Sequence, residues 1–287
     1  MFVRCLAIFL LFHSLDGLAA SYPVDIAKGF IITTAVIDGE SVQVILDSGA
    51  PGIVLNEKYY STDKNKEVRC TGLNGSFNCG VHTIRSWEWL GAEDGKTKAL
   101  VSDLTFLENA AKRPIHAIIG LSMLADYYVS IDFDNQIITI QKEMPESLES
   151  SFSKITYVDH LPVIACTVNG QKKILGLDTG SAANYLFNFD SERMSISQMS
   201  TTPVMVVGTD NREVLQYRIA MDLQIQKEEI PIASSFIVDL KNKEQSSYDA
   251  FDGILGQEFL MQYNLIIHQG KQKMMLIPRH QEDVVLK

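Results

Sequence analysis

The sequence predicts a mainly β protein made of two similar lobes with a cleft between them. Three observations predict it: apolar runs of strand length, hairpin turn signals between those runs, and a repeat of the whole pattern in the second half of the chain. The 287 residues, 46% of them hydrophobic and 21% charged, suffice for one large domain or two smaller ones. This balance excludes wholesale disorder.

The first twenty residues have the features of a secretory signal peptide. Arg4 precedes an apolar stretch, residues 5–12, that is too short to span a bilayer. The small residues Ala19 and Ala20 suit cleavage by a signal peptidase, and an N-terminal membrane anchor is the alternative. We expect residues 1–20 to be a signal peptide and the mature protein to be extracytoplasmic, periplasmic or secreted, without membrane contact.

Each half of the chain opens with a hairpin whose second arm ends in an acid. Residues 38–39 (Asp-Gly) and 169–170 (Asn-Gly) are hairpin signals, because both central residues of a type I′ turn need positive φ. Nine residues after each turn begins stands an acid, Asp47 in ILDSGAPG and Asp178 in LGLDTGSA. The two acids are 178 − 47 = 131 positions apart.

A second motif also occurs twice. Two apolar residues and a glycine stand at 118–120 and at 254–256. Their glycines follow the acids by 120 − 47 = 73 and 256 − 178 = 78 positions. After each glycine we expect a short helical segment and then a closing hairpin.

The repeat also suggests how the chain divides. A polar stretch at 142–154, with Pro145 and several Ser and Glu, is the natural linker. We therefore expect an N-terminal lobe over residues 21–141 and a C-terminal lobe over residues 155–287.

Acids at matching points of two β lobes can build one site. A single Asp at a strand end is explained by turn and capping preferences alone. A pseudo-two-fold axis, however, can bring two acids face to face, where they share a proton. The ionised one can then take a proton from water while the protonated one polarises the substrate. The hydroxyls of Ser48 and Thr179 can fix this pair, and Gly49 and Gly180 let backbone approach it.

The segments ILDSGAPG and LGLDTGSA resemble the Asp-(Thr/Ser)-Gly-(Ala/Ser) motif of aspartic peptidases. The Ile-Ile-Gly and Ile-Leu-Gly segments resemble the second signature of that clan. The short lobes are more similar to retropepsin-type domains than to those of pepsin, here fused in tandem in one chain, which suits a bacterial exported protein. The resemblance covers residues 30–280. It implies β-barrel-like lobes, a flap over the cleft, and peptide hydrolysis by the pair Asp47 and Asp178 without metal or other cofactor.

The flap implied by the resemblance lies in the middle of each copy, near residues 70–80 and 206–214. Cys70 and Cys79 bracket a Gly/Asn-rich turn that can bring them together as a disulfide in an oxidising compartment. Cys166 stands in an apolar stretch and is expected to be a buried free thiol.

Charge and spacing exclude other classes. The formal net charge of −10 argues against nucleic acid and anionic membranes as partners. The six histidines are scattered without metal-ligand spacing, and each is expected to be structural.

Three functions remain. The first is an aspartic endopeptidase, a monomer whose lobes form an internal pseudo-dimer around one site and whose substrate is a peptide or protein. The second is a catalytically silent peptide-binding module with the same fold. The third is a peptidase whose lobes pair with those of another chain. We expect the first, because both acids and both hydroxyls are present and local concentration favours internal pairing.

Overall fold

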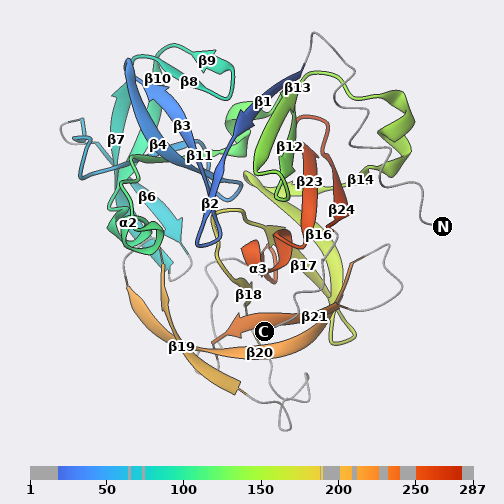
Figure 1. Cartoon of the computed structure of the whole chain (residues 1–287). Helices are drawn as coiled ribbons and strands as arrows, with labels where there is room; N and C mark the ends of the chain where they lie inside the picture. The colour runs from blue at the N-terminus through green and yellow to red at the C-terminus, as the bar shows by residue number, and fades with distance from the viewer. Residues whose placement is uncertain are drawn as a thin grey trace, which may run out of the picture.

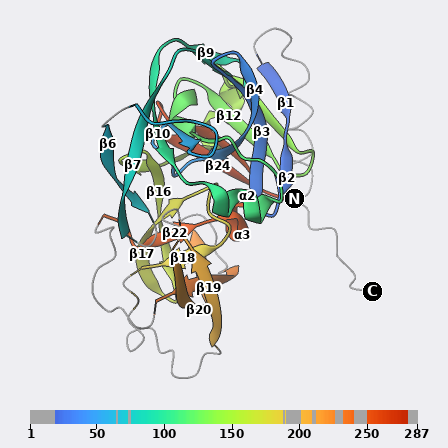
Figure 2. The same cartoon turned by 90° about the vertical axis from the view of Figure 1, so that its left-hand side faces the viewer.

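A computed structural model of the chain is mainly β and bilobal, which confirms the predicted fold class (Figures 1 and 2). No helix in the described part is long and apolar enough to cross a membrane. The expected signal peptide lies outside the described residues except for Ala19 and Ala20. The structure describes residues 19–63, 66–72, 75–187, 189, 201–208, 212–225, 232–239 and 250–279.

The first half of the chain folds around a ten-stranded sheet, which occupies the upper part of Figure 2. Its order is β6-β7-β10-β5-β11-β4-β3-β8-β9, with β2 paired to β3. The strands are β2 (Asp25–Ala27), β3 (Phe30–Ile37), β4 (Glu40–Asp47), β5 (Ile53–Asn56), β6 (Glu67–Gly72), β7 (Gly75–Ile84), β8 (Trp87–Trp89), β9 (Ala92–Asp94), β10 (Thr97–Ser102) and β11 (Ala117–Gly120). The helical segments are α2 (Thr105–Ala111) and η2 (Leu121–Leu124).

The second half folds around an eight-stranded sheet of order β15-β16-β17-β22-β18-β21-β20-β19, in the lower part of Figure 2. The elements are β15 (Thr156–Val158), β16 (Leu161–Val168), β17 (Gln171–Leu177), β18 (Asn184–Leu186), β19 (Thr201–Val207), β20 (Glu213–Ile225), β21 (Ile232–Val238), β22 (Gly253–Leu255) and α3 (Gln257–Leu260).

A six-stranded sheet joins the halves, with β12 beside β23 at its centre (Figure 1). Ser130 of β12 pairs with Ile266 of β23, 266 − 130 = 136 positions away. The glycines of the two second motifs are also 256 − 120 = 136 positions apart, so equivalent residues pair across a pseudo-two-fold axis. The sheet runs β1 (Ala19–Pro23), β13 (Ile137–Gln141), β12 (Tyr128–Asp132), β23 (Tyr263–His268), β24 (Lys273–Pro278), β14 (Ser153–Lys154).

The predicted hairpin turns form in both halves. Asp38 and Gly39 have φ of 51° and 87°, and Asn169 and Gly170 have φ of 45° and 75°. Asp and Asn tolerate this left-handed conformation better than other side chains, and Gly adopts it freely. The turns therefore fix the register in which β4 and β17 leave their hairpins.

Asp47 ends β4 and Asp178 directly follows β17, and each of these strands is paired along both edges. Ile45 and Leu46 of β4 are buried, and β4 pairs antiparallel with β3 and parallel with β11. That parallel register sets Gly120 opposite Asp47. In the second half, β22 pairs in the same way with β17, with Leu255 opposite Leu177. The second motif therefore lies beside the acid-bearing strand in both halves.

The linker at residues 142–154 contains regular secondary structure. It contains a short 3-10 helix, η3 (Glu146–Ser151), whose Leu148 is buried, and strand β14. Ser153 of β14 pairs with Met274 of β24, so this segment completes the edge of the shared sheet.

Candidate active site

Asp47 and Asp178 lie side by side where the two halves meet. Their carboxyl groups hydrogen-bond to each other, and each also accepts a bond from its own loop. The Gly49 N–H donates to Asp47 Oδ1 at 2.7 Å, and the Gly180 N–H donates to Asp178 Oδ1 at 2.9 Å. Both side chains are half-buried, with part of their surface open to a cleft.

Ser48 and Thr179 lock the two loops together beneath the acids. The Ser48 N–H donates to Thr179 Oγ1 at 2.9 Å, and the Thr179 N–H donates to Ser48 Oγ at 2.9 Å. Each hydroxyl then donates across the axis, from Ser48 to the Leu177 carbonyl (2.7 Å) and from Thr179 to the Leu46 carbonyl (3.1 Å). Both residues are buried, so these bonds hold the carboxyl groups at one separation without competition from water.

Replacing Thr179 with valine is expected to destabilise the fold. The substitution keeps the shape but leaves the Ser48 N–H and the Leu46 carbonyl without a partner in a buried place. Each such group costs about 1–3 kcal/mol. Urea denaturation measures the loss, with Thr139→Val as control, because the Thr139 hydroxyl bonds Ser21 at an exposed site. Equal stability of the two variants would contradict the role assigned to the lock.

Burial and mutual repulsion set the protonation of the pair. Burial, and then the negative charge of Asp178, raise the pKa of Asp47 well above its ordinary value. Burial also raises the pKa of Asp178, although hydrogen bonds from Asp47 and from the N–H groups of Gly180 and Ser181 oppose that rise. Two adjacent carboxyl groups of this kind lose their protons in two separate steps, and between those steps they share one proton.

The glycines after the hydroxyls leave no room for a side chain. A Cβ on Gly180 would lie 2.5 Å from Asp47 Oδ2, and one on Gly49 would lie 3.0 Å from each carboxylate oxygen of Asp178. The backbone of each loop therefore approaches the acid of the other half closely, which only glycine permits here.

The acids lie in a cleft of about 540 Å³ whose walls are largely apolar. The first half contributes the flap strands β6 and β7 and a floor of aliphatic side chains, and the second half contributes the β15–β16 turn and the segment before β22. The apolar members are Val54, Val68, Phe77, Leu100, Leu104, Ile118, Val158, Leu161, Phe251 and Ile254.

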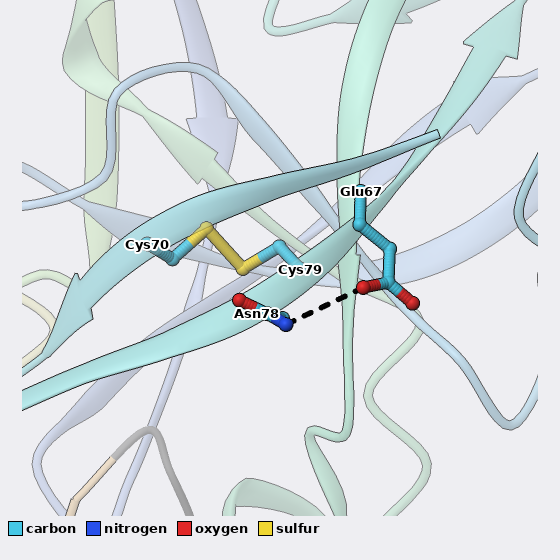
Figure 3. Close-up of a disulfide and its surroundings, with 4 residues drawn as sticks. All are labelled: Glu67, Cys70, Asn78 and Cys79. Carbon is cyan, nitrogen blue, oxygen red and sulfur yellow. Dashed lines mark hydrogen bonds between the residues drawn. A yellow bond between two sulfur atoms is a disulfide. The ribbon is translucent and has the colours of Figure 1, made fainter. Parts of the chain in front are cut away.

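The predicted disulfide between Cys70 and Cys79 is present and braces the flap hairpin (Figure 3). Cys70 lies opposite Phe77 and Cys79 opposite Val68, so the bridge joins β6 and β7 diagonally. Asn78 also donates to Glu67 across the hairpin at 3.4 Å. The predicted buried free thiol of Cys166 is also confirmed. Of the described residues, those of the matching β19–β20 hairpin do not line the cleft.

Solved structures with this architecture are found, although the sequence itself matches no protein-family model and no curated protein. One is an aspartic proteinase from Irpex lacteus, with a TM-score of 0.56 and 11% identity over 93% of this chain and 99% of that one. The fold is that of an aspartic proteinase. Another is the basic 7S globulin from soybean, with a TM-score of 0.52 and 10% identity over 94% of this chain and 97% of that one.

The aspartic-proteinase fold alone does not decide activity, since one of these neighbours is named a proteinase and the other a globulin. A functional conclusion therefore depends on the side chains in the cleft.

Three ionisable residues of the cleft, Arg69, Asp159 and His160, were not among the site residues expected from the sequence. Arg69 lies on the flap strand β6, and His160 lies in the turn between β15 and β16. The repeat offered a signal for His160. The acids are 131 positions apart, and the same offset, 160 − 131 = 29, leads to residue 29 in the matching turn between β2 and β3. Arg69 has no comparable signal in the sequence.

Proposed function

We propose that the protein is an aspartic endopeptidase that hydrolyses peptide bonds with water activated by Asp47 and Asp178. One observation carries the proposal: two carboxyl groups that hydrogen-bond to each other at the base of a flap-covered cleft. A structural role alone would not require two acids in mutual repulsion, because an uncharged pair would stabilise the same contact at lower cost.

The chemistry follows from the single shared proton. The ionised carboxylate takes a proton from a water molecule as its oxygen attacks the scissile carbonyl carbon, and the protonated carboxyl group gives its proton to the carbonyl oxygen. A tetrahedral diol results. As the C–N bond then breaks, one hydroxyl of the diol gives its proton to the ionised carboxylate and becomes the new carbonyl, while the protonated carboxyl group gives its proton to the leaving amine. The pair again holds one proton, as at the start.

The cleft supports a peptide as substrate. Its largely apolar walls on both sides of the acids suit peptides with apolar side chains next to the cut bond. The flap offers backbone groups of β6 and β7 beside the acids, where an extended peptide can add hydrogen bonds.

The alternative is a catalytically silent peptide-binding module. The structural likeness to a protein named a globulin supports considering it. Incubating the mature protein and its Asp178→Asn variant with a degenerate peptide library across about pH 3 to 8 separates the two. Cleavage by the wild type but not by the variant supports the peptidase. Peptide capture without cleavage by both proteins would replace that proposal with the binding module.

The activity is expected to follow a bell-shaped pH profile. The rate falls at low pH, where both acids are protonated, and at high pH, where both are ionised. Because burial raises the pKa of both acids, the maximum is expected above the ordinary carboxyl range of about pH 4. Initial rates on one cleaved peptide at constant ionic strength measure the profile. A rate that climbs steadily into the alkaline range would contradict a shared proton.

We also propose that the protein works outside the cytoplasm as a monomer. A disulfide within its flap needs an oxidising compartment, and a single chain supplies both acids of the pair. Cell fractionation and the mass in solution test the two statements separately.

A further inference from the structure

His160 reaches across the axis to the loop that follows Asp47. Its Nε2 hydrogen-bonds to the Gly49 carbonyl oxygen, and since a carbonyl only accepts, Nε2 carries the proton. The side chain is half-buried and lines the cleft together with both acids. The contact therefore joins a titratable side chain of the second half to the acid-bearing loop of the first.

Gly49 is wedged between the two carboxyl groups. Its N–H donates to Asp47 Oδ1 at 2.7 Å, and a Cβ on it would lie only 3.0 Å from the carboxyl carbon of Asp178. A peptide group that moves here changes the contacts of both acids. The group that hydrogen-bonds to the Gly49 carbonyl oxygen therefore fixes the relative positions of the two carboxyl groups.

At the matching position of the other half, no side chain is present to make an equivalent contact. The residue that matches His160 is Gly29, which has no side chain to extend across the axis. A Cβ on Gly29 would lie 3.4 Å from the Cβ of Gln257, whose amide donates instead to the Thr179 carbonyl at 2.7 Å. An ionisable imidazole thus holds the first loop and a neutral amide holds the second, so the pair is asymmetric.

We propose that His160 is a positioning residue, which fixes Gly49 between the two carboxyl groups and, when protonated, keeps the negative charge of the pair on Asp178. The inference rests on the proposed peptidase function. Besides the hydrogen bonds to Asp178, the positive charge of His160 opposes the rise that burial causes in the pKa of that carboxyl group. Burial and the charge of Asp178 raise the pKa of Asp47 well above its ordinary value, so we expect the shared proton on Asp47.

Besides the two acids, two other charged residues line the cleft together with His160 in the described part of the chain. Asp159 precedes it in the same turn, and Arg69 projects from the flap strand β6. With Asp47 and Asp178 they are the charged residues that line the described part of the cleft beside His160. Substitutions at position 160 leave all four unchanged, so a change in the pH profile of such a variant reports on the imidazole.

The test compares His160→Gln with His160→Ala in the full mature protein. The Gln amide nitrogen stands near the position of Nε2 and can still donate to the Gly49 carbonyl, but it carries no charge. We expect His160→Gln to keep kcat at its optimum within about threefold of wild type, while the acidic limb of kcat/KM moves up by roughly half a pH unit or more. His160→Ala is expected to show the same shift and to lose about tenfold or more in kcat.

His82→Gln is the matched control, because His82 also hydrogen-bonds to a carbonyl, that of Ser61, at 2.7 Å. It should leave both quantities unchanged. An acidic limb at the wild-type pH in His160→Gln, or a wild-type kcat in His160→Ala, would overturn the proposal.

A second readout does not need turnover. Titration of the carboxyl carbons of Asp47 and Asp178 by NMR, assigned with the two Asn variants, follows the proton directly. Loss of the imidazole is expected to raise the lower titration step of the pair by roughly half a unit or more. If the wild type cuts no peptide, the proposed function fails while this titration still decides the role of His160. An unchanged lower step would reject that role.

Discussion

Asparagine in place of Asp178 is expected to lower kcat by about 10²–10⁴-fold, and Asp47→Asn is expected to do the same. Each substitution keeps the size of the side chain but removes one of the two groups that exchange the shared proton. Neither remaining acid can both accept a proton from water and supply one to the carbonyl oxygen. Single-turnover assays on a cleaved peptide measure the loss, and activity within tenfold of wild type in either variant would reject the dyad.

The same variants are expected to gain stability at neutral pH, which distinguishes lost chemistry from lost fold. Because burial raises the pKa of Asp178, the folded state binds its proton more tightly than the unfolded state. That contribution to stability is complete below the ordinary carboxyl pKa and is lost as the pH rises through the folded-state pKa. A neutral amide avoids the loss. The free energy of unfolding of Asp178→Asn, relative to wild type, should therefore rise between about pH 4 and pH 7.

Gly180→Ala is expected to be the most damaging change that leaves every polar group of the site in place. Its Cβ would lie 2.5 Å from Asp47 Oδ2 and 2.7 Å from Oδ1. The Asp47 carboxyl group cannot turn away freely, because it is bonded to the Gly49 N–H and to Asp178. A displacement of about 1 Å at a reacting group costs about 10²-fold, so we expect kcat/KM to fall by at least that factor.

Two further alanine variants set the scale for this result. Gly49→Ala places its Cβ 3.0 Å from the Asp178 carboxyl group, a milder approach, and should cost less than Gly180→Ala. Gly95→Ala meets nothing within 4 Å and should behave as wild type. Full activity in Gly180→Ala would contradict the prediction, because it would mean that catalysis tolerates displacement of the Asp47 carboxyl group. An equal loss in Gly95→Ala would point to a general effect on folding.

The repeat made much of the fold predictable, because its signals are local. Two-residue turns with Asp-Gly and Asn-Gly, continuous apolar runs and glycines at fixed distances from the acids can all be recognised in the sequence itself. The disulfide across the flap followed from two cysteines that flank one turn. These features repeat or lie close together, so they needed no knowledge of contacts between distant residues.

Elements that depend on distant partners could not be predicted in the same way. Strand β8 is three residues long and exists because it pairs with β3, where Trp89 lies opposite Ala35 and its indole N–H donates to Thr33 at 2.8 Å. Helix α2 falls between the flap and the second motif of the first half, and the segment 142–154 acquires structure where β14 meets β24.

The role of His160 depended on distance in space as well. Histidine in a polar turn is ordinarily a surface residue, so residue type alone gave no reason to single it out. Its contact with Gly49, 160 − 49 = 111 positions away, exists only after the two halves have docked. Matching the two copies position by position would have paired it with Gly29, but not revealed what it touches.

The shared sheet makes the two halves dependent on each other for solubility. A chain ended after Lys154 would keep β12 but lose β23, the strand that covers its outer edge. Val129 and Ile131, both buried in the whole molecule, would then border a row of unpaired backbone groups. Such a fragment would either aggregate or pair with a second copy of itself along that edge. Neither half is therefore expected to be soluble as a monomer on its own.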